Sequence, residues 1–267
     1  MRKAFKENYF TAIKQVVAML VYFIGTGGSE GIPAHLCTCS TCNEARKFGF
    51  AQRRPSTLAV ITENRKAVLF DVGTDIRDFL NVPLEAIFLT HWHHDHIYGL
   101  YKLRWMARET KLYAPEGHAD ALILNDPKNL RPNVIRPWET LEVDTLRITP
   151  LRLNHEVETL GYLIEEGDKA VALLYDTKGL PEETRDFLKR KAPLRLAIVD
   201  ATYPPGTDDP YHNSVDEAAE IGLSLAERTV LSHISHKNLP FLELTEYVRR
   251  RWGNRVLVAY DGMLFYV

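Results

Sequence analysis

Short apolar runs that end in a polar residue recur along this chain, and they constrain its fold more than any other feature. Their β-branched content and turn boundaries predict strands, and a helical period predicts helices between several of them. The predicted strands cover residues 20–24, 57–62, 67–73, 86–91, 146–153, 161–166, 170–176, 194–201, 228–234 and 255–262, and the predicted helices cover 98–108, 181–190, 215–226 and 242–251. This order predicts an α/β fold with enough strands for two sheets.

The same pattern predicts one domain rather than two. The chain has 267 residues, of which 45% are hydrophobic, so it is long enough to bury a large core. Its sequence shows no repeat, low-complexity tract or Pro/Gly/Ser-rich linker. We expect residues 19–267 to form a single domain and residues 1–18 to form an N-terminal extension. That extension is either a helix or a segment upstream of a natural start at Met19.

Charge and cysteine content narrow the classes of partner and compartment. The 33 basic and 35 acidic residues are spread along the chain, so we expect no stable nucleic-acid binding. Three cysteines confined to residues 37–42 cannot form a disulfide framework, which predicts a cytoplasmic protein. The apolar run VVAMLVYFIG is shorter than a membrane span, and GTGGSEG follows it where a secretory cleavage site should stand. We therefore expect no membrane association.

Histidine or aspartate stands at or near the end of several predicted strands. These residues are Asp71, His91, Asp176, Asp200, His233 and Asp261. Apolar strands that finish in this way indicate one shared site at a sheet edge. Asp71, Asp200 and Asp261 are candidates to orient metal-bound histidines by accepting their free N–H groups, although each could equally cap a turn.

The stretch THWHHDH, residues 90–96, holds four of the ten histidines. We expect the loop after its strand to bring His91, His93, Asp95 and His96 together. Imidazole and carboxylate suit zinc, manganese or iron, and a catalytic metal needs only three protein ligands, so the cluster indicates two metals. The alternative is a surface patch of histidines, or a few core histidines whose hydrogen bonds are satisfied. His94 fits the spacing less well and is left out of the ligand set.

Two metals also need ligands from elsewhere in the chain. His155 follows LRITPLRLN, Asp176 follows AVALLY and His233 follows RTVLS. A carboxylate such as Asp176 can bridge two cations at the roughly 3.5–4 Å spacing of two-metal hydrolytic sites. Each residue alone could cap a turn, but together with the THWHHDH loop they predict a dinuclear site.

With these motifs, the chain resembles the metallo-β-lactamase superfamily of metal-dependent hydrolases from about Val21 onward. The resemblance rests on THWHHDH, LNHEVETLGY, YDT and SHISH, in that order. It implies a four-layer αββα sandwich, in which two facing sheets are flanked by helices. It also implies one metal held by His91, His93 and His155, another held by Asp95, His96 and His233, and a bridge formed by Asp176.

A second motif, CTCSTC, places Cys37, Cys39 and Cys42 soon after the first strand. Three soft ligands lack only a fourth for a closed tetrahedral zinc site. His236 could supply it, and His35 and His118 are weaker candidates. The alternative is three buried or free thiols without a metal.

FIGTGGSEGIP, the cysteine loop and SHISH together resemble the phosphodiesterases of the carbon–phosphorus lyase pathway. That family implies a dinuclear site, a structural zinc on three cysteines and one histidine, cleavage of cyclic phosphodiesters and, as its oligomeric state, a homodimer. It also implies that His212, in YHNSVDEA, is a general acid or a transition-state contact. The GTGGSEG stretch fits no phosphate-binding glycine motif, so we expect it to be a tight turn that lines the metal cleft.

These observations predict a metal-dependent phosphoric diester hydrolase that acts on a small or cyclic phosphodiester. We expect two divalent ions, zinc or manganese, at the active site and one structural zinc. The paired cations would lower the pKa of a bridging water and so provide a hydroxide nucleophile. Asp95 and His212 are the predicted catalytic residues, with His212 stabilising charge or protonating the leaving oxygen.

Other functions fit some of the same residues. The metal ligands alone also suit a thioesterase or a lactonase. The tRNA 3′-processing endonucleases share H-x-H-x-D-H but carry a long tRNA-gripping arm, and no basic, glycine-rich insertion of that kind stands in this sequence. A non-catalytic, zinc-stabilised binding protein would not need the complete ligand set. A di-iron redox protein would be expected to carry glutamate in place of His93 and an appended flavin domain.

Overall fold

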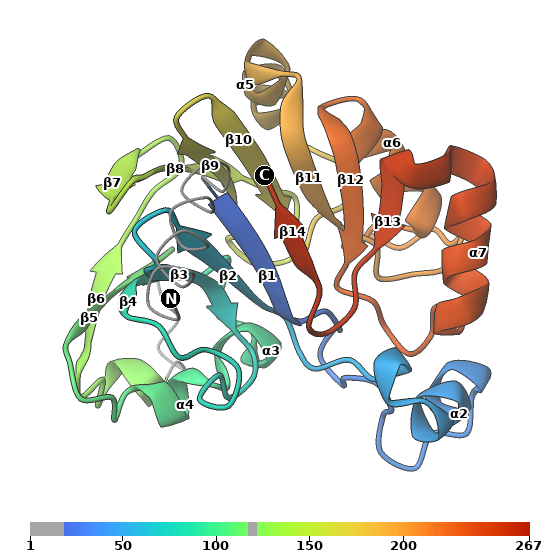
Figure 1. Ribbon diagram of the computed structural model, residues 1–267, viewed down its shortest axis with the longest axis horizontal. Coiled ribbons are helices and arrows are strands. Elements are labelled where there is room, and N and C mark those ends of the chain that lie inside the picture. The colour runs from blue at the N-terminus through green and yellow to red at the C-terminus, as the bar shows by residue number, and fades with distance from the viewer. Residues whose placement is uncertain (1–18, 117–121) are drawn as a thin grey trace, which may run out of the picture.

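The computed structural model describes residues 19–116 and 122–267, which form two facing seven-stranded sheets (Figure 1). The N-terminal extension and His118 lie outside the described residues. The first sheet has the order β14 (Leu264–Tyr266), β1 (Met19–Gly25), β2 (Thr57–Thr62), β3 (Ala67–Val72), β4 (Leu84–Phe88), β5 (Thr110–Ala114) and β6 (Leu130–Val134). The second has the order β13 (Val256–Val258), β12 (Ala226–Ser232), β11 (Leu194–Asp200), β10 (Lys169–Leu174), β9 (Leu160–Glu166), β8 (Leu146–Arg152) and β7 (Leu141–Val143).

Each sheet combines a parallel half with an antiparallel half. Strands β3 to β6 are parallel in the first sheet, and β10 to β13 are parallel in the second. The other neighbouring strands pair antiparallel. The carboxyl ends of parallel strands lie at one edge of a sheet, which is where ligand sites of α/β proteins form.

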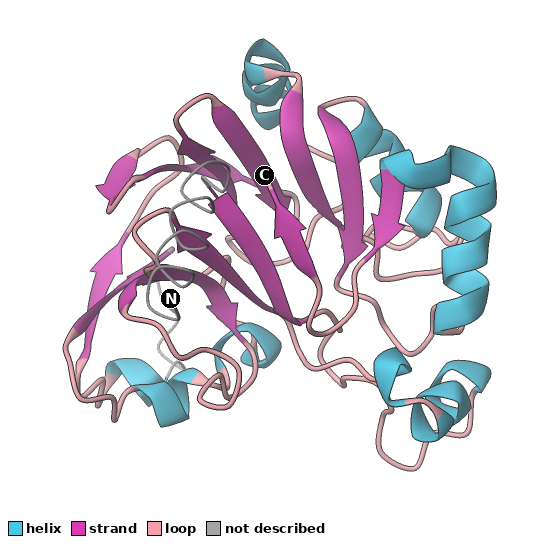
Figure 2. Cartoon of the chain, in the orientation of Figure 1, coloured by secondary structure: helices cyan, strands magenta, loops and turns pink. Residues whose placement is uncertain are grey.

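The helices lie outside the sheets (Figure 2). Their bounds are α2 (Ser40–Lys47), α3 (His94–Ile97), α4 (Leu100–Leu103), α5 (Glu182–Lys191), α6 (Val215–Leu223) and α7 (Phe241–Trp252), with short 3₁₀ turns η1 (Gly49–Ala51), η2 (Leu122–Leu124) and η3 (Gly253–Arg255). None of the helices in the described ranges has the length and apolar character needed to cross a bilayer.

Three apolar clusters separate the layers. Between the sheets, Phe70, Phe88 and Tyr162 pack with ring centroids 5.3–5.5 Å apart. The outer face of the first sheet packs against Ile97 of α3 and Leu100 of α4, and the outer face of the second sheet packs against side chains of α5, α6 and α7. These interfaces confirm the predicted αββα sandwich, because each sheet buries one face on the other sheet and the opposite face under helices.

The predicted strands are confirmed with shifts at their ends, but the helix predicted over 98–108 is wrong. Only α4 is helical there, because the next carbonyls bond elsewhere. The carbonyl of Arg104 accepts the Asn129 backbone N–H at 3.1 Å, and that of Met106 accepts Asn129 Nδ2 at 2.6 Å. The chain therefore turns early into β5. Strands β5, β6, β7 and β14 and helices α2 and α3 were not predicted.

Candidate metal centre and active site

The carboxyl ends of the central strands bring the predicted ligands together. The THWHHDH loop follows β4, Asp176 follows β10 and His233 follows β12. Asp71 and Asp200 lie at the ends of β3 and β11 and are fully buried. These strand-end side chains therefore lie together at one edge of the sheets, where the sequence analysis places a shared site.

Asp261 does not belong to this edge. Its carboxylate accepts hydrogen bonds from the backbone N–H groups of Thr26 and Arg54, at 3.0 and 2.7 Å. It also accepts a bond from the Thr26 hydroxyl at 2.8 Å. Of the two roles considered for Asp261, the structure supports the cap of a turn and not the orientation of a site histidine, because Asp261 holds the start of the GTGGSEG turn in place.

The first group of ligand atoms surrounds one oxygen of Asp176. Oδ2 of Asp176 lies 3.7 Å from Nε2 of His91 and 3.8 Å from Nε2 of His155. Nδ1 of His93 lies 3.5 Å from Nε2 of His155. Ligand atoms of all four residues fall within 4.8 Å of one another, the separation that a single metal ion can span.

The second group surrounds the other oxygen of Asp176. Oδ1 of Asp176 lies 3.4 Å from Nε2 of His96 and 3.2 Å from Nε2 of His233. Oδ2 of Asp95 lies 3.3 Å from each of the same two nitrogens. Asp176 thus presents one oxygen to each group, as a carboxylate that bridges two cations must do.

Unpaired polar atoms show that these residues fit metal ions. Nε2 of His91, Nε2 of His96 and Oδ1 of Asp176 are buried and have no hydrogen-bond partner in the described part of the chain. Leaving such a group unsatisfied costs about 1–3 kcal/mol. Divalent cations between the two groups would satisfy all three atoms with ligand types that zinc and manganese accept.

Neighbouring oxygens set the protonation of three histidines. Nδ1 of His96 donates to Asp71 at 2.7 Å. The Thr90 hydroxyl donates to Asp71 at 2.9 Å and accepts from Nδ1 of His91 at 2.9 Å. The Thr202 hydroxyl likewise donates to Asp200 at 2.6 Å, which leaves it free to accept from Nδ1 of His233 at 2.8 Å. In each histidine the bond at Nδ1 orients the ring so that Nε2 faces the site, where it could bind a metal ion once its proton is displaced.

These threonines were not predicted from the sequence. Thr90 precedes His91 directly, and Thr202 stands two residues after Asp200. The position of the Thr90 hydroxyl next to the histidine motif could have indicated its role. For Thr202, the 31-residue separation from His233 gave no signal.

Charge balance at the site favours added cations. Burial raises the pKa of Asp176, but the nearby His233 and His96 outweigh burial and hold it well below its usual range. Burial lowers the pKa of His96, but Asp176 and Asp95 outweigh burial and raise it well above its usual value. Without metals, protons on these histidines offset the carboxylates, and bound divalent ions would replace those protons.

His212 lies beside both ligand groups. Its ring stacks on His233 with centroids 5.4 Å apart and meets His155 edge-on at 5.1 Å. Nδ1 of His212 donates to Asp200 at 2.8 Å. Burial lowers the pKa of His212, but this hydrogen bond and the Asp200 charge outweigh burial and raise it to about 9. The capping box of Ser214 and Glu217 fixes the start of α6 just after His212.

The predicted cysteine cluster is also assembled. Cys37, Cys39, Cys42 and His236 have ligand atoms within 4.8 Å of one another, and Nδ1 of His236 lies 3.3 Å from Sγ of Cys37 and 3.8 Å from Sγ of Cys39. Backbone N–H groups of Ala34 and Cys42 donate to sulfurs of this cluster, at 3.3 and 3.4 Å. Such bonds favour thiolates, the ligand form of cysteine, but burial outweighs the Ala34 bond and raises the pKa of the Cys42 thiol, so a bound cation would be needed to hold Cys42 as a thiolate.

The weaker alternatives for the fourth ligand are not supported. His35 is exposed and belongs to none of the ligand groups of the described chain, and His118 lies outside the described residues. His94, which was left out of the ligand set, is also exposed.

A cavity of about 400 Å³ opens beside the ligand groups, as the prediction for the GTGGSEG turn requires. Gly28 and Glu30 of that turn, His212, His233 and Lys237 line it. A Cβ at Gly28 would lie 3.3 Å from Cε1 of His233, so glycine allows the turn to approach the ligand closely.

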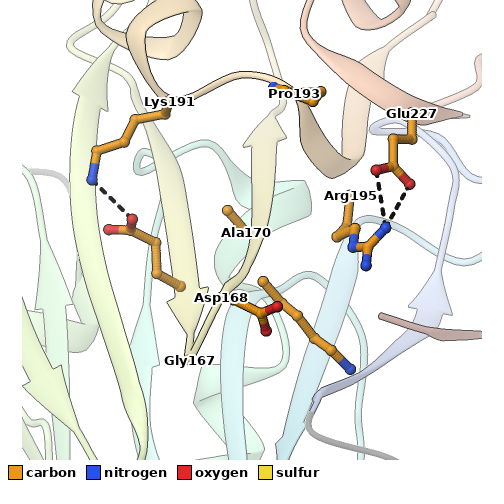
Figure 3. A pocket seen from close by; sticks show the side chains of 9 residues that line it. Gly167, Asp168, Ala170, Lys191, Pro193, Arg195 and Glu227 are labelled. Carbon is orange, nitrogen blue, oxygen red and sulfur yellow. Dashed lines mark hydrogen bonds and ion pairs between the residues drawn. The ribbon is translucent and has the colours of Figure 1, made fainter.

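Another hollow, of about 430 Å³, lies at the opposite ends of the same strands (Figure 3). Four of its charged groups are already paired, with Lys191 on Glu165 at 2.9 Å and Arg195 on Glu227 at 2.8 Å. It offers no group of histidines, cysteines and carboxylates comparable to the metal edge among the described residues. We therefore place the functional site at the carboxyl edge.

Comparisons with known proteins identify the family of the chain. A family model described as the beta-lactamase superfamily domain matches residues 66–234. The chain is 28% identical over 296 residues to a ribonuclease Z from Metallosphaera sedula, covering 87% of this chain and 94% of that protein. It superimposes on the crystal structure of a new diphosphatase from the PhnP family with a TM-score of 0.77 and 25% identity, covering 93% of this chain and 98% of that one.

A further relative is an octanoyltransferase from Porphyromonas gingivalis. It is 30% identical over 237 residues, which cover 82% of this chain and 46% of that protein. The chain therefore spans about half the length of this relative. Because the superfamily match extends over more than half of the present sequence, the chain belongs to the beta-lactamase superfamily, as a hydrolase with the metallo-β-lactamase fold.

Proposed function

We propose that this protein is a dinuclear metal-dependent phosphodiesterase that hydrolyses small or cyclic phosphodiesters. The division of the Asp176 oxygens between two groups of histidines carries the proposal. His91, His93 and His155 would hold one ion, Asp95, His96 and His233 the other, and Asp176 both. Cys37, Cys39, Cys42 and His236 would hold a structural zinc. The proposal includes a single catalytic domain over residues 19–267 that acts in the cytoplasm.

When bound, two divalent zinc or manganese ions supply a water molecule of lowered pKa and neutralise charge on the phosphoryl oxygens. The chain's own residues perform the remaining work. Asp95 stays ionised, because His96 and His233 outweigh burial and hold its pKa far below the usual range. Its carboxylate would therefore remain an anionic ligand at any ordinary pH, and its catalytic part would be to orient the attacking water by accepting a hydrogen bond from it.

His212 is suited to the opposite task. Its pKa of about 9 keeps the imidazole protonated at neutral pH. Nδ1 is held by Asp200, so Nε2 is the nitrogen that can donate a proton to the departing oxygen or a hydrogen bond to the phosphoryl group.

The cavity supports a small substrate. Its volume of about 400 Å³ suits a nucleotide-sized molecule, and it joins His212 and His233 directly. The similarity to a PhnP-family diphosphatase supports phosphorus chemistry at this site.

The test is hydrolysis by metal-analysed protein of bis(p-nitrophenyl) phosphate, 2′,3′-cyclic nucleotides and a nucleoside diphosphate. Wild type should turn over a diester. Asp95→Ala should lose turnover together with metal, and His212→Ala should lose about 10²–10⁴-fold in kcat with metal content unchanged. His94→Ala is the matched control, since this exposed histidine lies in the same loop, and it should behave as wild type. Absence of diester turnover in fully metallated wild type would refute the assignment.

The second candidate function is that of a tRNA 3′-processing endonuclease. It is favoured by the similarity to a ribonuclease Z, because the aligned region covers 94% of that protein. A precursor tRNA is therefore assayed alongside a thioester and a lactone. Endonucleolytic cleavage at the tRNA 3′ end, with no turnover of small diesters, would replace the first proposal by this one.

A further inference from the structure

Glu30 of the GTGGSEG turn contacts the segment that carries ligands of both metal sites. Its Oε1 accepts a hydrogen bond from the Ser235 hydroxyl at 2.7 Å and one from the His236 backbone N–H at 3.3 Å. The same oxygen lies 3.4 Å from Nε2 of His236. One carboxylate oxygen thus faces three donors of a segment more than 200 residues away.

These contacts define how His236 faces the cysteines. Nδ1 points at the sulfurs of Cys37 and Cys39, at 3.3 and 3.8 Å, so this nitrogen must be unprotonated to bind zinc. The ring proton then resides on Nε2, beside Glu30. A carboxylate that accepts the second N–H of a ligand histidine fixes its tautomer and orientation and makes the ligand nitrogen more basic.

We propose that Glu30 is a positioning residue for zinc at the cluster of Cys37, Cys39, Cys42 and His236. This inference rests on the proposed zinc site and not on the proposed phosphodiesterase reaction. Glu30 acts through His236 in two ways, by holding its backbone and by orienting its ring.

The same contact joins the zinc cluster to the wall of the catalytic cavity. The Gly28 N–H donates to the Ile234 carbonyl at 3.2 Å, and the Ile234 N–H donates to the Thr26 carbonyl at 3.0 Å. Backbone hydrogen bonds therefore join the GTGGSEG turn to the segment from His233 to His236, and Glu30 makes its contact at the end of this segment that carries the proposed zinc ligand His236. A zinc ion there would brace the turn that lines the cavity.

The experiment measures zinc affinity by competition with a chromogenic chelator, for wild type, Glu30→Gln and a matched Glu220→Gln. Glu220 is exposed on α6 and makes no side-chain bond within the described ranges. Glutamine keeps the shape of Glu30 but removes its charge. We expect the cysteine site of Glu30→Gln to bind zinc about 10–100-fold more weakly, and that of Glu220→Gln to match wild type. The thiolate-to-cobalt charge-transfer band of cobalt-substituted protein identifies the cysteine site.

A second pair of variants, made in a protein that already carries His236→Cys, distinguishes the positioning of His236 by Glu30 from a general loss of structure. His236→Cys replaces the imidazole by a thiolate, which has no second N–H for Glu30 to accept. The Glu30→Gln effect on zinc affinity should therefore be smaller in this background, because only the contacts of Glu30 with Ser235 and with the backbone of residue 236 remain. Circular dichroism and metal content of the dinuclear site report on folding in every variant.

Each outcome decides the proposal. Unchanged affinity in Glu30→Gln, or an equal loss in the wild-type and His236→Cys backgrounds, overturns the role of Glu30. A wild type that gives no thiolate–cobalt band overturns the zinc site itself, and this result is independent of whether the protein hydrolyses diesters.

Discussion

The close approach of β3 to the ligand loop makes Gly73 a sensitive position. A Cβ built at Gly73 would lie 1.8 Å from the carbonyl oxygen of Asp95 and 2.8 Å from that of Ser56. Real Cβ contacts do not fall below about 3.0 Å, and both obstacles are backbone atoms that cannot rotate away. Gly73→Ala must therefore displace the backbone of Asp95 by roughly 1 Å or more.

The cost follows from overpacking a buried backbone contact. Such strain typically costs about 1–3 kcal/mol, and we expect the upper end because no side chain can yield. For a chain of this size, 3 kcal/mol corresponds to a fall in Tm of about 6–12 °C. Because Asp95 is a proposed ligand, metal at the group of Asp95, His96 and His233 should also be lost.

The assay combines thermal melting with metal analysis. Gly49→Ala is the matched control, because a Cβ there meets no atom within 4 Å, and its stability should change by no more than about 0.5 kcal/mol. If Gly73→Ala melts within about 1 °C of wild type and retains its metal, the close packing of β3 against the THWHHDH loop is wrong.

Three other substitutions test separate contacts. Asp200→Asn removes the carboxylate that raises the pKa of His212 to about 9. His212 must be protonated to act as an acid, so the high-pH fall of kcat should move to lower pH, and an unmoved limb would exclude His212 as that acid. Asp261→Ala leaves the backbone N–H groups of Thr26 and Arg54 without their acceptor, which should cost about 1–3 kcal/mol in urea unfolding, and a cost below about 0.5 kcal/mol would contradict this. Thr90→Val removes the acceptor for Nδ1 of His91 and should weaken metal binding about 10–100-fold, whereas the control Thr229→Val removes a buried hydroxyl that has no partner in the described chain and should not.

The proposed ligands could be found in the sequence because their chemistry and their position after apolar strands are both local features. His91, Asp176 and His233 each follow a run of buried residues, and the fold gathers the ends of such runs. The apolar strands were predictable for the same reason. By contrast, β6 is exposed along most of its length and contains Pro132, so no apolar pattern marks it. Helix α2 is polar on most of its surface, so it also lacks an apolar pattern from which it could be predicted.

Contacts between distant segments could not be predicted. The pairing of Glu30 with Ser235 and His236, and of Thr202 with His233, depends on how the two sheets' loops meet. Which oxygen of Asp176 faces which histidine is likewise a property of the assembled edge. No spacing along the chain encodes these relations.

Backbone strain at the edge explains why strand ends, rather than strands, carry the chemistry. Asp71, Asp176 and His233 have φ angles of 56°, 48° and 58°, in the left-handed region that non-glycine residues rarely adopt. Strain of this kind costs about 1–3 kcal/mol per residue and persists only where the surroundings over-determine it. Asp71 is the penultimate residue of the buried strand β3, and Asp176 and His233 closely follow the buried ends of β10 and β12, so packed strands hold each of these residues in place. Glycine at these positions would relieve the strain. It would also remove a proposed metal ligand at residues 176 and 233, or the acceptor for His96 at residue 71. The buried sheets therefore stabilise a strained backbone conformation that places these side chains in the site.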